Sequence, residues 1–347
     1  MSATTDLQTA PPPPESRPPG PDRAAGRRRR ISGEGRLATF LVAPTIVLLA
    51  VVIGYPVVRA VVMSFQKDPG LDPATGLFTS GGSAGLSNYT HWVLQQCTSA
   101  TGGTKACPPG TLGAQFWDSV GTTVFFTVVT VSIEVVLGMW MATVMNRSFR
   151  GRALLRASVL VPWAIPTAVT AKLWYFIFAY DGVANRVLHT HILWTGDAWA
   201  ARFAVIIADV WKTTPFVALL ILAGLQVIPA EVYEAAHVDG ANAWQRFVRV
   251  TLPMIRPALM VAVLFRALDV LRIYDLPAIL TGGGGGGGHA TTTLSILVVD
   301  QIRQGFNRAA ALSTLTFLFI FAVAFLFVRV LGANAVRTQQ RQQKGTI

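Results

Sequence analysis

The sequence predicts an all-α integral membrane protein with six transmembrane helices and both termini in the cytoplasm. Three observations support this: an apolar composition, six long apolar segments, and an alternating distribution of basic residues. Hydrophobic residues make up 52% of the 347 residues and charged residues only 13%, whereas soluble globular chains usually contain about 25% charged residues. This composition favours a lipid-embedded protein over a soluble protein with a large core.

Six segments are long and apolar enough to cross a membrane. A hydrocarbon core of about 30 Å requires roughly 20 apolar residues in a helix. The fifth segment is the least apolar, because Arg266, Asp269 and Arg272 interrupt it. We expect the spans at residues 37–65, 119–145, 157–180, 202–228, 257–280 and 309–331.

Basic residues predict the orientation of these spans. They are more frequent before span one, between spans two and three, between spans four and five, and after span six than in the remaining loops. Cytoplasmic loops carry such an excess of Lys and Arg. The alternation therefore places both termini in the cytoplasm and supports the number of spans.

The sequence divides into a Pro- and Arg-rich cytoplasmic arm (1–36), a six-helix transmembrane domain (37–333) and a cytoplasmic tail (334–347). The arm lacks the apolar content that would offset the entropy of ordering it, so we expect it to be disordered. Four consecutive arginines, at 27–30, lie near its end. We interpret them as a membrane-flanking basic segment rather than an export signal or a nucleic-acid patch, because an apolar span follows at once.

The first predicted external loop, residues 66–115, contains both cysteines of the chain, Cys97 and Cys107. Oxidising conditions outside the cytoplasm permit a disulfide, which would close a loop of about ten residues. Two free thiols are the alternative. The five histidines show no spacing typical of metal ligands, so we expect no metal site.

The predicted cytoplasmic loop at residues 229–256 has the pattern of a rigid helix–turn–helix. Pro229 suits the first turn of a helix, and the two glutamates that follow suit the positive end of the helix dipole. The Asp-Gly pair that ends in Gly240 supplies a turn. A second short helix is expected at residues 241–250, ended by Pro253.

This loop resembles the signature loop of bacterial ABC import permeases: Glu-Ala-Ala, three residues, Gly, nine residues, then a β-branched residue, one further residue and Leu-Pro. The resemblance implies the MetI-like ABC importer permease fold and a coupling helix that sits in a cleft of an ATPase subunit. The positions that it assigns to this contact and its turn are Glu231, Glu234, Ala235, Ala236, Asp239 and Gly240.

The same resemblance implies partners: a second permease subunit, two copies of a cytoplasmic ATPase subunit, an external substrate-binding lipoprotein, a sugar, and the bilayer of the bacterial inner membrane. No G-x-x-x-x-G-K-[ST] motif occurs, so the chain itself is not expected to bind ATP. The ATPase partners would bind ATP and Mg. For this chain we expect no cofactor, no nucleic acid and no catalytic residue.

Other segments resemble carbohydrate importers of the maltose-transporter type, in particular the first-type permease of a heterodimeric pair. They include Tyr55-Pro56, Asp275-Leu276-Pro277 and the Pro-Trp-Ala-Ile-Pro stretch at 162–166. The basic, proline-rich arm is similar to that of a trehalose importer permease. Seven glycines at 282–288 stand where the family usually has Gly-Gly-Gly-Pro, and we expect them to form a flexible external loop.

Ionisable residues inside spans are energetically expensive and by default have functional or paired roles. Those in spans four and five, with the neighbouring aromatic rings, offer the polar groups and apolar faces that a sugar requires. The alternative is structural: salt bridges of Asp209 with Lys212, or of Asp269 with Arg272. The resemblance to the maltose-type permease implies sugar contacts at Trp163, Thr167, Asp209, Trp211, Lys212, Thr213, Phe216, Phe265, Asp269 and Arg272.

The predicted function is the permease subunit of an ATP-driven sugar importer. Trehalose is the expected substrate, and another di- or oligosaccharide such as maltose is the alternative. An ion-coupled secondary transporter would also use intramembrane charges, but it would leave the signature loop unexplained. A membrane enzyme for a lipid-linked sugar would need a carboxylate or histidine constellation near the interface, and the sequence shows none. Glu134 and Lys172, in spans two and three, are expected to form pairs or to face the partner subunit.

Overall fold

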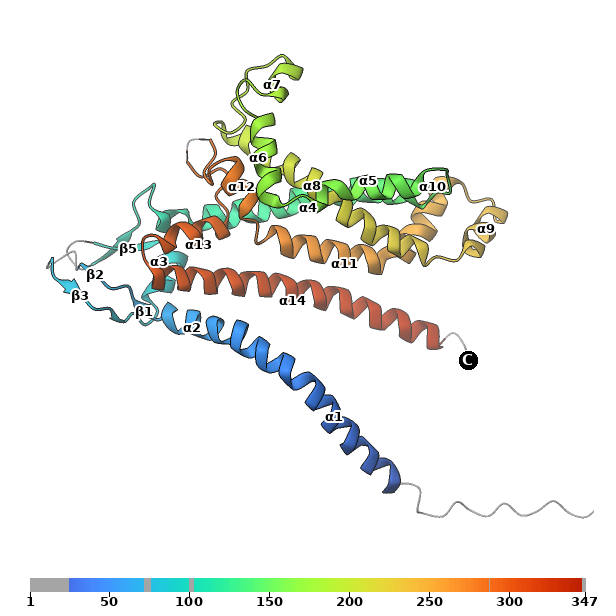
Figure 1. Cartoon of the computed structure of the whole chain (residues 1–347), viewed down its shortest axis with the longest axis horizontal. Helices are drawn as coiled ribbons and strands as arrows, with labels where there is room; N and C mark the ends of the chain where they lie inside the picture. Colours follow the sequence, from blue (N-terminus) through green and yellow to red (C-terminus); the bar gives the residue numbers. More distant parts are fainter. Residues whose placement is uncertain (1–24, 72–75, 100–102, 287, 345–347) are drawn as a thin grey trace, which may run out of the picture. The chain divides into compact units, whose positions relative to one another are not determined.

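The computed structural model describes residues 25–71, 76–99, 103–286 and 288–344, and most of them are helical (Figure 1). The chain divides into two compact units, residues 1–59 and residues 60–347. Among the described residues, five helices are long and apolar enough to cross a membrane, and one bent pair of helices raises the number of candidate spans to six. The chain is thus a helical membrane protein, as its composition predicts.

The first unit is a long apolar helix. α1 (Ala25–Leu49) is followed by the π-helix η2 (Ala50–Gly54) and by α2 (Tyr55–Ser64), in which this unit ends. The π-helix accommodates Pro56: Tyr55 N–H donates to the Ala50 carbonyl, five residues back, just before the proline that has no donor. Of the predicted disordered arm, residues 1–24 lie outside the described residues, and residues 25–36 are helical instead.

The second unit contains the remaining elements of the chain. Its helices after α2 are α3 (Ser87–Val93), the 3-10 helix η3 (Leu112–Gln115), α4 (Phe116–Asn146), α5 (Arg152–Ala164), α6 (Thr167–Ile177), α7 (Val183–Leu188), α8 (Ala198–Gln226), α9 (Ala230–Val238), α10 (Ala243–Arg246), the π-helix η4 (Phe247–Thr251), α11 (Leu252–Val270), α12 (Asp275–Leu280), α13 (Leu294–Ile302) and α14 (Phe306–Lys344).

α8 is the central helix of this unit, with 72% of its apolar stretch buried. α4 packs along it, and α11 packs against both (Figure 1). Gly138 of α4 permits the close approach, since a Cβ atom there would lie 2.9 Å from Cγ1 of Val217. Small residues at such crossings let membrane helices pack closely where lipid provides no hydrophobic drive between them.

The third candidate span is broken. α5 and α6 meet at an angle of 89°, so the continuous helix expected at 157–180 is not what the structure has. The cause is Pro166: the residue before a proline is pushed out of the α region, and Ile165 has an extended backbone (φ −72°, ψ 132°).

The fifth candidate span begins and ends earlier than the predicted 257–280. One helix runs over Ala243–Val270, and it includes α10, η4 and α11. The prediction that Pro253 ends a helix is wrong, because η4 shifts the hydrogen-bond ladder just before it, with Leu252 N–H donating to the Phe247 carbonyl. The chain then leaves the helix over 271–274, and α12 follows.

The last helix, α14, extends the predicted sixth span (309–331) in both directions and includes the described part of the predicted tail. Its N-terminus is held by the predicted external loop. The Asp68 carboxylate accepts the backbone N–H groups of Asn307 (2.6 Å) and Arg308 (3.1 Å). Helix N-termini leave such donors unpaired, so Asp68 fastens the loop to α14.

The predicted external loop contains short strands, so in this loop the structure differs from the predicted all-α chain. β1 (Gln66–Lys67) pairs with β4 (Gly82–Ser83), β2 (Gly70–Leu71) with β3 (Phe78–Thr79), and β5 (Gln96–Thr98) with β6 (Thr104–Ala106). A disulfide between Cys97 and Cys107 fastens the end of the β5–β6 hairpin. Although His91 lies beside them, these sulfur atoms are therefore not free to bind a metal.

The glycine run, where it is described, is packed rather than flexible. A Cβ atom on Gly286 would lie 2.2 Å from the backbone nitrogen of Ala198 in α8, a distance that real atoms do not tolerate. The Oγ of Thr292 donates to the Gly283 carbonyl at 2.8 Å. Only glycine allows a backbone to approach another helix this closely, so the run closes over the start of α8.

We expect both cysteines to resist a maleimide reagent until the protein is reduced, and to take two labels per chain afterwards. Replacing Cys97 and Cys107 together by serine removes a cross-link between residues ten apart, which is worth roughly 2–3 kcal/mol in the chain-entropy account. An added protease should then cut the β5–β6 hairpin faster. The single variant Cys97→Ser provides the labelled control, and labelling of the unreduced wild-type chain would contradict the disulfide.

Candidate functional site

Four ionisable side chains form an ion-pair cluster at the centre of the second unit. Arg266 of α11, only 2% exposed, donates from Nε to Oε2 of Glu134 at 2.6 Å and from Nη2 to Oδ2 of Asp209 at 2.7 Å. Its Nη1 bonds to the carboxylate of Asp269, a side chain that is 65% exposed. One guanidinium group therefore joins α4, α8 and α11.

The geometry of arginine explains why it occupies this place. Glu134 is fully buried, and a buried carboxylate is costly unless it is both paired and hydrogen-bonded. The planar guanidinium presents five donors in a fixed fork, and here each of its three nitrogens serves a carboxylate. The hydroxyl of Thr213 donates a further hydrogen bond, 2.6 Å long, to Oε1 of Glu134.

Lys212 makes a contact other than the salt bridge with Asp209 that was considered from the sequence. Its ammonium group donates to the carbonyl of Ile165, which the break of the third span leaves without a helical partner. α8 therefore holds the bend between α5 and α6. In the described part of the chain, neither Asp209 nor Asp269 pairs with the residue considered from the sequence, since both bind Arg266.

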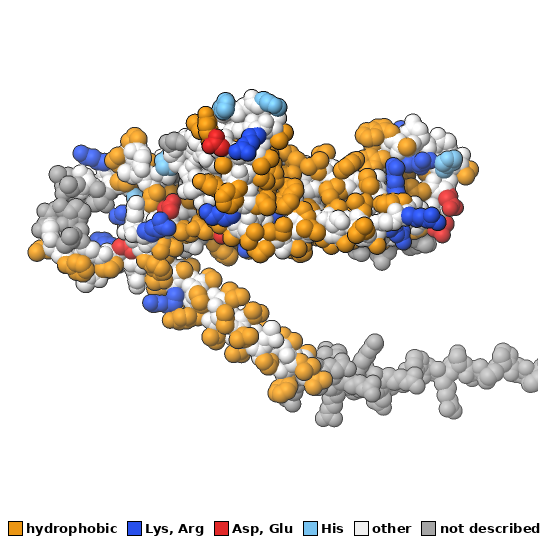
Figure 2. Space-filling model, turned by 45° about the horizontal axis from the view of Figure 1, so that its top comes forward, with side chains coloured by type: hydrophobic (Ala, Val, Ile, Leu, Met, Phe, Trp, Pro, Cys, Tyr) orange, Lys and Arg blue, Asp and Glu red, His pale blue; other side chains and the backbone are white. Residues whose placement is uncertain are grey.

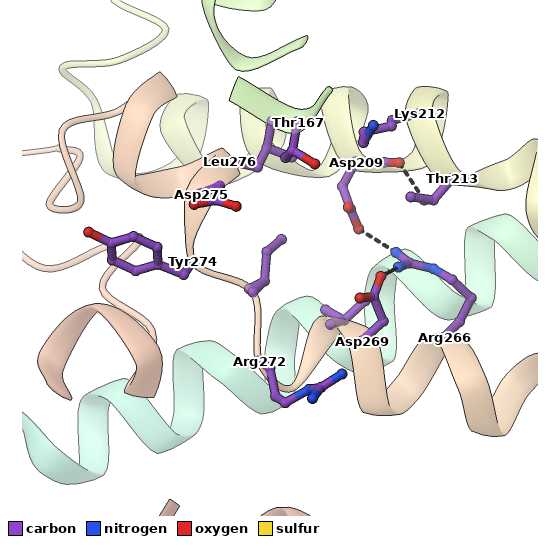
Figure 3. A pocket seen from close by; sticks show the side chains of 12 residues that line it. Thr167, Asp209, Lys212, Thr213, Arg266, Asp269, Arg272, Tyr274, Asp275 and Leu276 are labelled. Atoms are coloured by element: carbon purple, nitrogen blue, oxygen red, sulfur yellow. Dashed lines mark hydrogen bonds and ion pairs between the residues drawn. The ribbon is translucent and has the colours of Figure 1, made fainter. Parts of the chain in front are cut away.

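A cavity of about 370 Å³ lies beside the cluster (Figure 3). It forms where the broken third span, the middle of α8 and the end of α11 meet. Its volume is in the range of about 300–1,000 Å³ typical of small-molecule sites, and interrupted helices commonly surround the solute site of transporters. The lining residues are Thr167, Asp209, Lys212, Thr213, Arg266, Asp269, Val270, Arg272, Ile273, Tyr274, Asp275 and Leu276.

Six of the ten predicted sugar-contact residues line this cavity: Thr167, Asp209, Lys212, Thr213, Asp269 and Arg272. The four aromatic ones do not. Trp163 stacks on Phe216 with ring centroids 5.9 Å apart, and Trp211 packs edge to face on Trp174 at 5.7 Å. Phe265 is 57% exposed. The structure thus separates a polar cavity from aromatic side chains on neighbouring surfaces.

Three polar residues of the lining were not among the predicted sugar contacts: Arg266, Tyr274 and Asp275. Arg266 was visible as a charge in span five, but its role depends on α4 and α8 lying beside α11. Tyr274 and Asp275 reach the cavity because the helix ends at Val270. The Asp-Leu-Pro motif that begins at 275 was the available signal. Glu134 is paired, as expected for it, with Arg266 as its partner.

The predicted coupling segment is a helix–turn–helix in the structure. Pro229 precedes α9, and Glu231 lies in its first turn. Gly240 has φ +77°, a conformation that favours glycine in the turn. A capping box between Asn242 and Gln245 then starts α10. Of the six residues assigned to the ATPase contact, Ala236 is half-buried, whereas Glu231, Glu234, Ala235, Asp239 and Gly240 are exposed.

Comparison with known proteins now defines the class. The chain belongs to the family described as binding-protein-dependent transport system inner membrane component, whose model matches residues 134–338. It is 36% identical over 303 residues to the trehalose/maltose transport system permease protein MalF of Thermococcus litoralis, covering 86% of this chain and 94% of that one. It is 38% identical over 306 residues to the trehalose transport system permease protein SugA of Mycobacterium tuberculosis, covering 87% and 91%.

A solved structure shares the fold. One chain of a crystal structure of a bacterial ABC transporter involved in the import of the acidic polysaccharide alginate matches with a TM-score of 0.67 and 21% identity, covering 90% of this chain and 99% of that chain. The resemblance to ABC import permeases that the signature loop suggested is therefore confirmed. These relatives are transport permeases rather than enzymes.

We expect Arg266→Met to destabilise the protein strongly, because it leaves Glu134 and Asp209 buried without a counter-charge. Breaking a buried pair from one side typically costs about 3–5 kcal/mol. Thermal unfolding of the purified protein in detergent measures the effect. Arg272→Met is the matched control, since Arg272 bonds to the Leu268 carbonyl at 3.3 Å and lies outside the cluster. Equal unfolding temperatures for the two variants would show that the ion-pair cluster does not stabilise the protein.

Proposed function

We propose that this chain is the first-type permease subunit of an ATP-driven ABC importer in the bacterial cytoplasmic membrane. With a second permease it would form the path for a disaccharide. Trehalose is the first candidate, because relatives that match most of the chain carry trehalose in their names, and maltose is the second for the same reason. Two copies of an ATPase subunit would hydrolyse ATP, and an external binding protein would deliver the sugar.

The observation that carries this proposal is the cavity at the broken spans. Its ionisable lining residues are Asp209, Asp269, Asp275, Lys212, Arg266 and Arg272. Three acidic and three basic groups give no net formal charge. The guanidinium of Arg266 is already shared among three carboxylates, so the lining has no excess of positive charge that would favour an acidic solute. An uncharged solute rich in hydroxyl groups fits this lining better.

Individual groups of the cavity match the hydroxyl groups and the apolar C–H surface of a sugar. The exposed carboxylate of Asp269 can accept hydrogen bonds from hydroxyl groups, and Arg272 can donate to them. The ring of Tyr274, 36% exposed, offers an apolar face for C–H groups and a phenol for a hydroxyl. Asp269 also bonds to Arg266, so a sugar on Asp269 would touch the cluster that joins three helices.

Coupling to the ATPase is proposed to run through the segment 231–253. Two features support it. Val238 (87% exposed) and Trp244 (71% exposed) leave apolar side chains uncovered beside Glu234 and Gly240, and such surfaces typically mark a protein contact. The helix that begins at α10 continues without a break to Val270, a rod of about 40 Å that connects this segment with the cavity.

A panel of sugars tests the substrate. In vesicles that contain the complete complex with its binding protein, trehalose should stimulate ATP hydrolysis and enter in an ATP-dependent way. Asp269→Asn should weaken the response roughly tenfold or more, because a hydrogen bond to a charged group is worth about 1.5–3 kcal/mol. The matched control is Asp181→Asn, an exposed carboxylate outside the cavity. Equal loss in both variants, or uptake that follows an ion gradient without ATP, would overturn the proposal.

A charge reversal tests the coupling. Glu234→Lys should abolish ATP-driven uptake while the protein keeps its unfolding temperature, because Glu234 is exposed. The ATPase subunit should also co-purify in lower yield. His237→Lys places a positive charge on the same helix, two residues before the Asp239-Gly240 turn, as a control for charge alone. Undiminished uptake by Glu234→Lys would remove this loop from the coupling path.

A further inference from the structure

A second cavity lies at the other end of the bundle, away from the sugar site. It has a volume of about 300 Å³ and is bounded by the end of α4, the end of α8 and the segment from α9 to η4. Its polar lining consists of Arg147, Arg246, Asn146, Tyr233, Thr143 and Thr251, and it includes no acidic side chain. The cavity therefore has a positive lining.

The two arginines lack a counter-ion among the described residues. All ion pairs among the described residues, that is, contacts of 4.0 Å or less between a basic nitrogen and a carboxylate oxygen, involve Arg266. Arg246 makes one long bond, 3.4 Å, to the Ala241 carbonyl. Most of the guanidinium donors of Arg147 and Arg246 are thus available, and the guanidinium fork binds phosphate oxygens in pairs.

The position of the cavity indicates where such a phosphate would come from. Asn146 is the last residue of α4, a candidate span, so the cavity lies at the level where a membrane helix ends. Figure 2 shows Lys and Arg side chains gathered at this end of the second unit. Basic pockets between membrane helices on the cytoplasmic side bind lipid head groups.

We propose that this cavity binds a phosphate group, carried by an anionic phospholipid or free in solution. A phosphate held by Arg147 of the α4 end and Arg246 of α10 bridges a membrane helix to the proposed coupling segment. The bond between Tyr233 and Thr251, 3.1 Å, already fastens α9 to η4 at the same cavity. The occupant then braces the segment on which the ATPase is proposed to act; this consequence, unlike the binding itself, rests on the proposed function.

Retention of lipid tests the binding. The complete complex is purified from membranes, washed in detergent with phosphatidylcholine, and exposed to phosphatidylglycerol, and bound lipid is measured by mass spectrometry. One basic residue near a membrane surface contributes about fivefold in affinity, so Arg147→Ala with Arg246→Ala should weaken binding roughly 30-fold. Arg150→Ala removes an exposed arginine of the same region outside the cavity and should bind as the wild type does.

Activity distinguishes the two sources of phosphate. In vesicles of phosphatidylcholine alone, sugar-stimulated ATP hydrolysis should rise when phosphatidylglycerol is added, and the double variant should lose this response. If inorganic phosphate replaces the lipid in both assays, the source is soluble and the site stands. Unchanged lipid and phosphate binding by the double variant overturns the proposal. So does loss of the ATPase subunit from the double variant with phosphate binding intact, because the arginines would then contact that partner. Lipid retention measures binding at this cavity even if the chain transports no sugar, so a failure of the proposed function would leave this test valid.

Discussion

Charge that is removed from water must be paired at short range, and at the centre of the second unit one guanidinium group pairs with three carboxylates. Arg266 reaches Glu134 on α4, Asp209 on α8 and Asp269 on its own helix. Because lipid gives membrane helices little reason to associate, such polar contacts decide how they are arranged. The cavity lies beside this cluster, so the same side chains fix the helices and shape the space between them.

The sequence predicts the parts of this arrangement that are local. Apolar length finds most spans, the helix–turn–helix at 229–253 follows from its caps and its turn, and the intramembrane charges mark the region of the cavity. It does not reveal which charges meet. Asp209 has Lys212 one turn away and yet pairs with Arg266, because helix packing brings α11 closer than spacing along one helix suggests. Partners across helices are a tertiary property, and a single sequence does not state them.

Proline shows the same limit in another form. Pro166 breaks a span, whereas Pro253 and Pro56 lie in continuous helices. The residue alone does not distinguish these outcomes. At Pro253 and Pro56 a π-helix immediately upstream shifts the hydrogen-bond ladder, so the helix continues although proline has no N–H donor. At Pro166 the helix breaks, and the ammonium group of Lys212, from another helix, donates to the carbonyl of Ile165 that the break exposes. Thr167, the first residue of α6 after this break, lines the cavity.

The double use of the cluster has a consequence for how relatives of this chain can diverge. A substitution at Arg266, Asp209 or Glu134 would alter the proposed solute site and the packing of the helices together, so we expect it to be accompanied by a compensating exchange on another helix. Arg272, Tyr274 and Asp275 lie on the opposite wall of the cavity (Figure 3), outside that cluster. New solute preferences are therefore most accessible through this wall, one residue at a time, while the other wall changes only in concert.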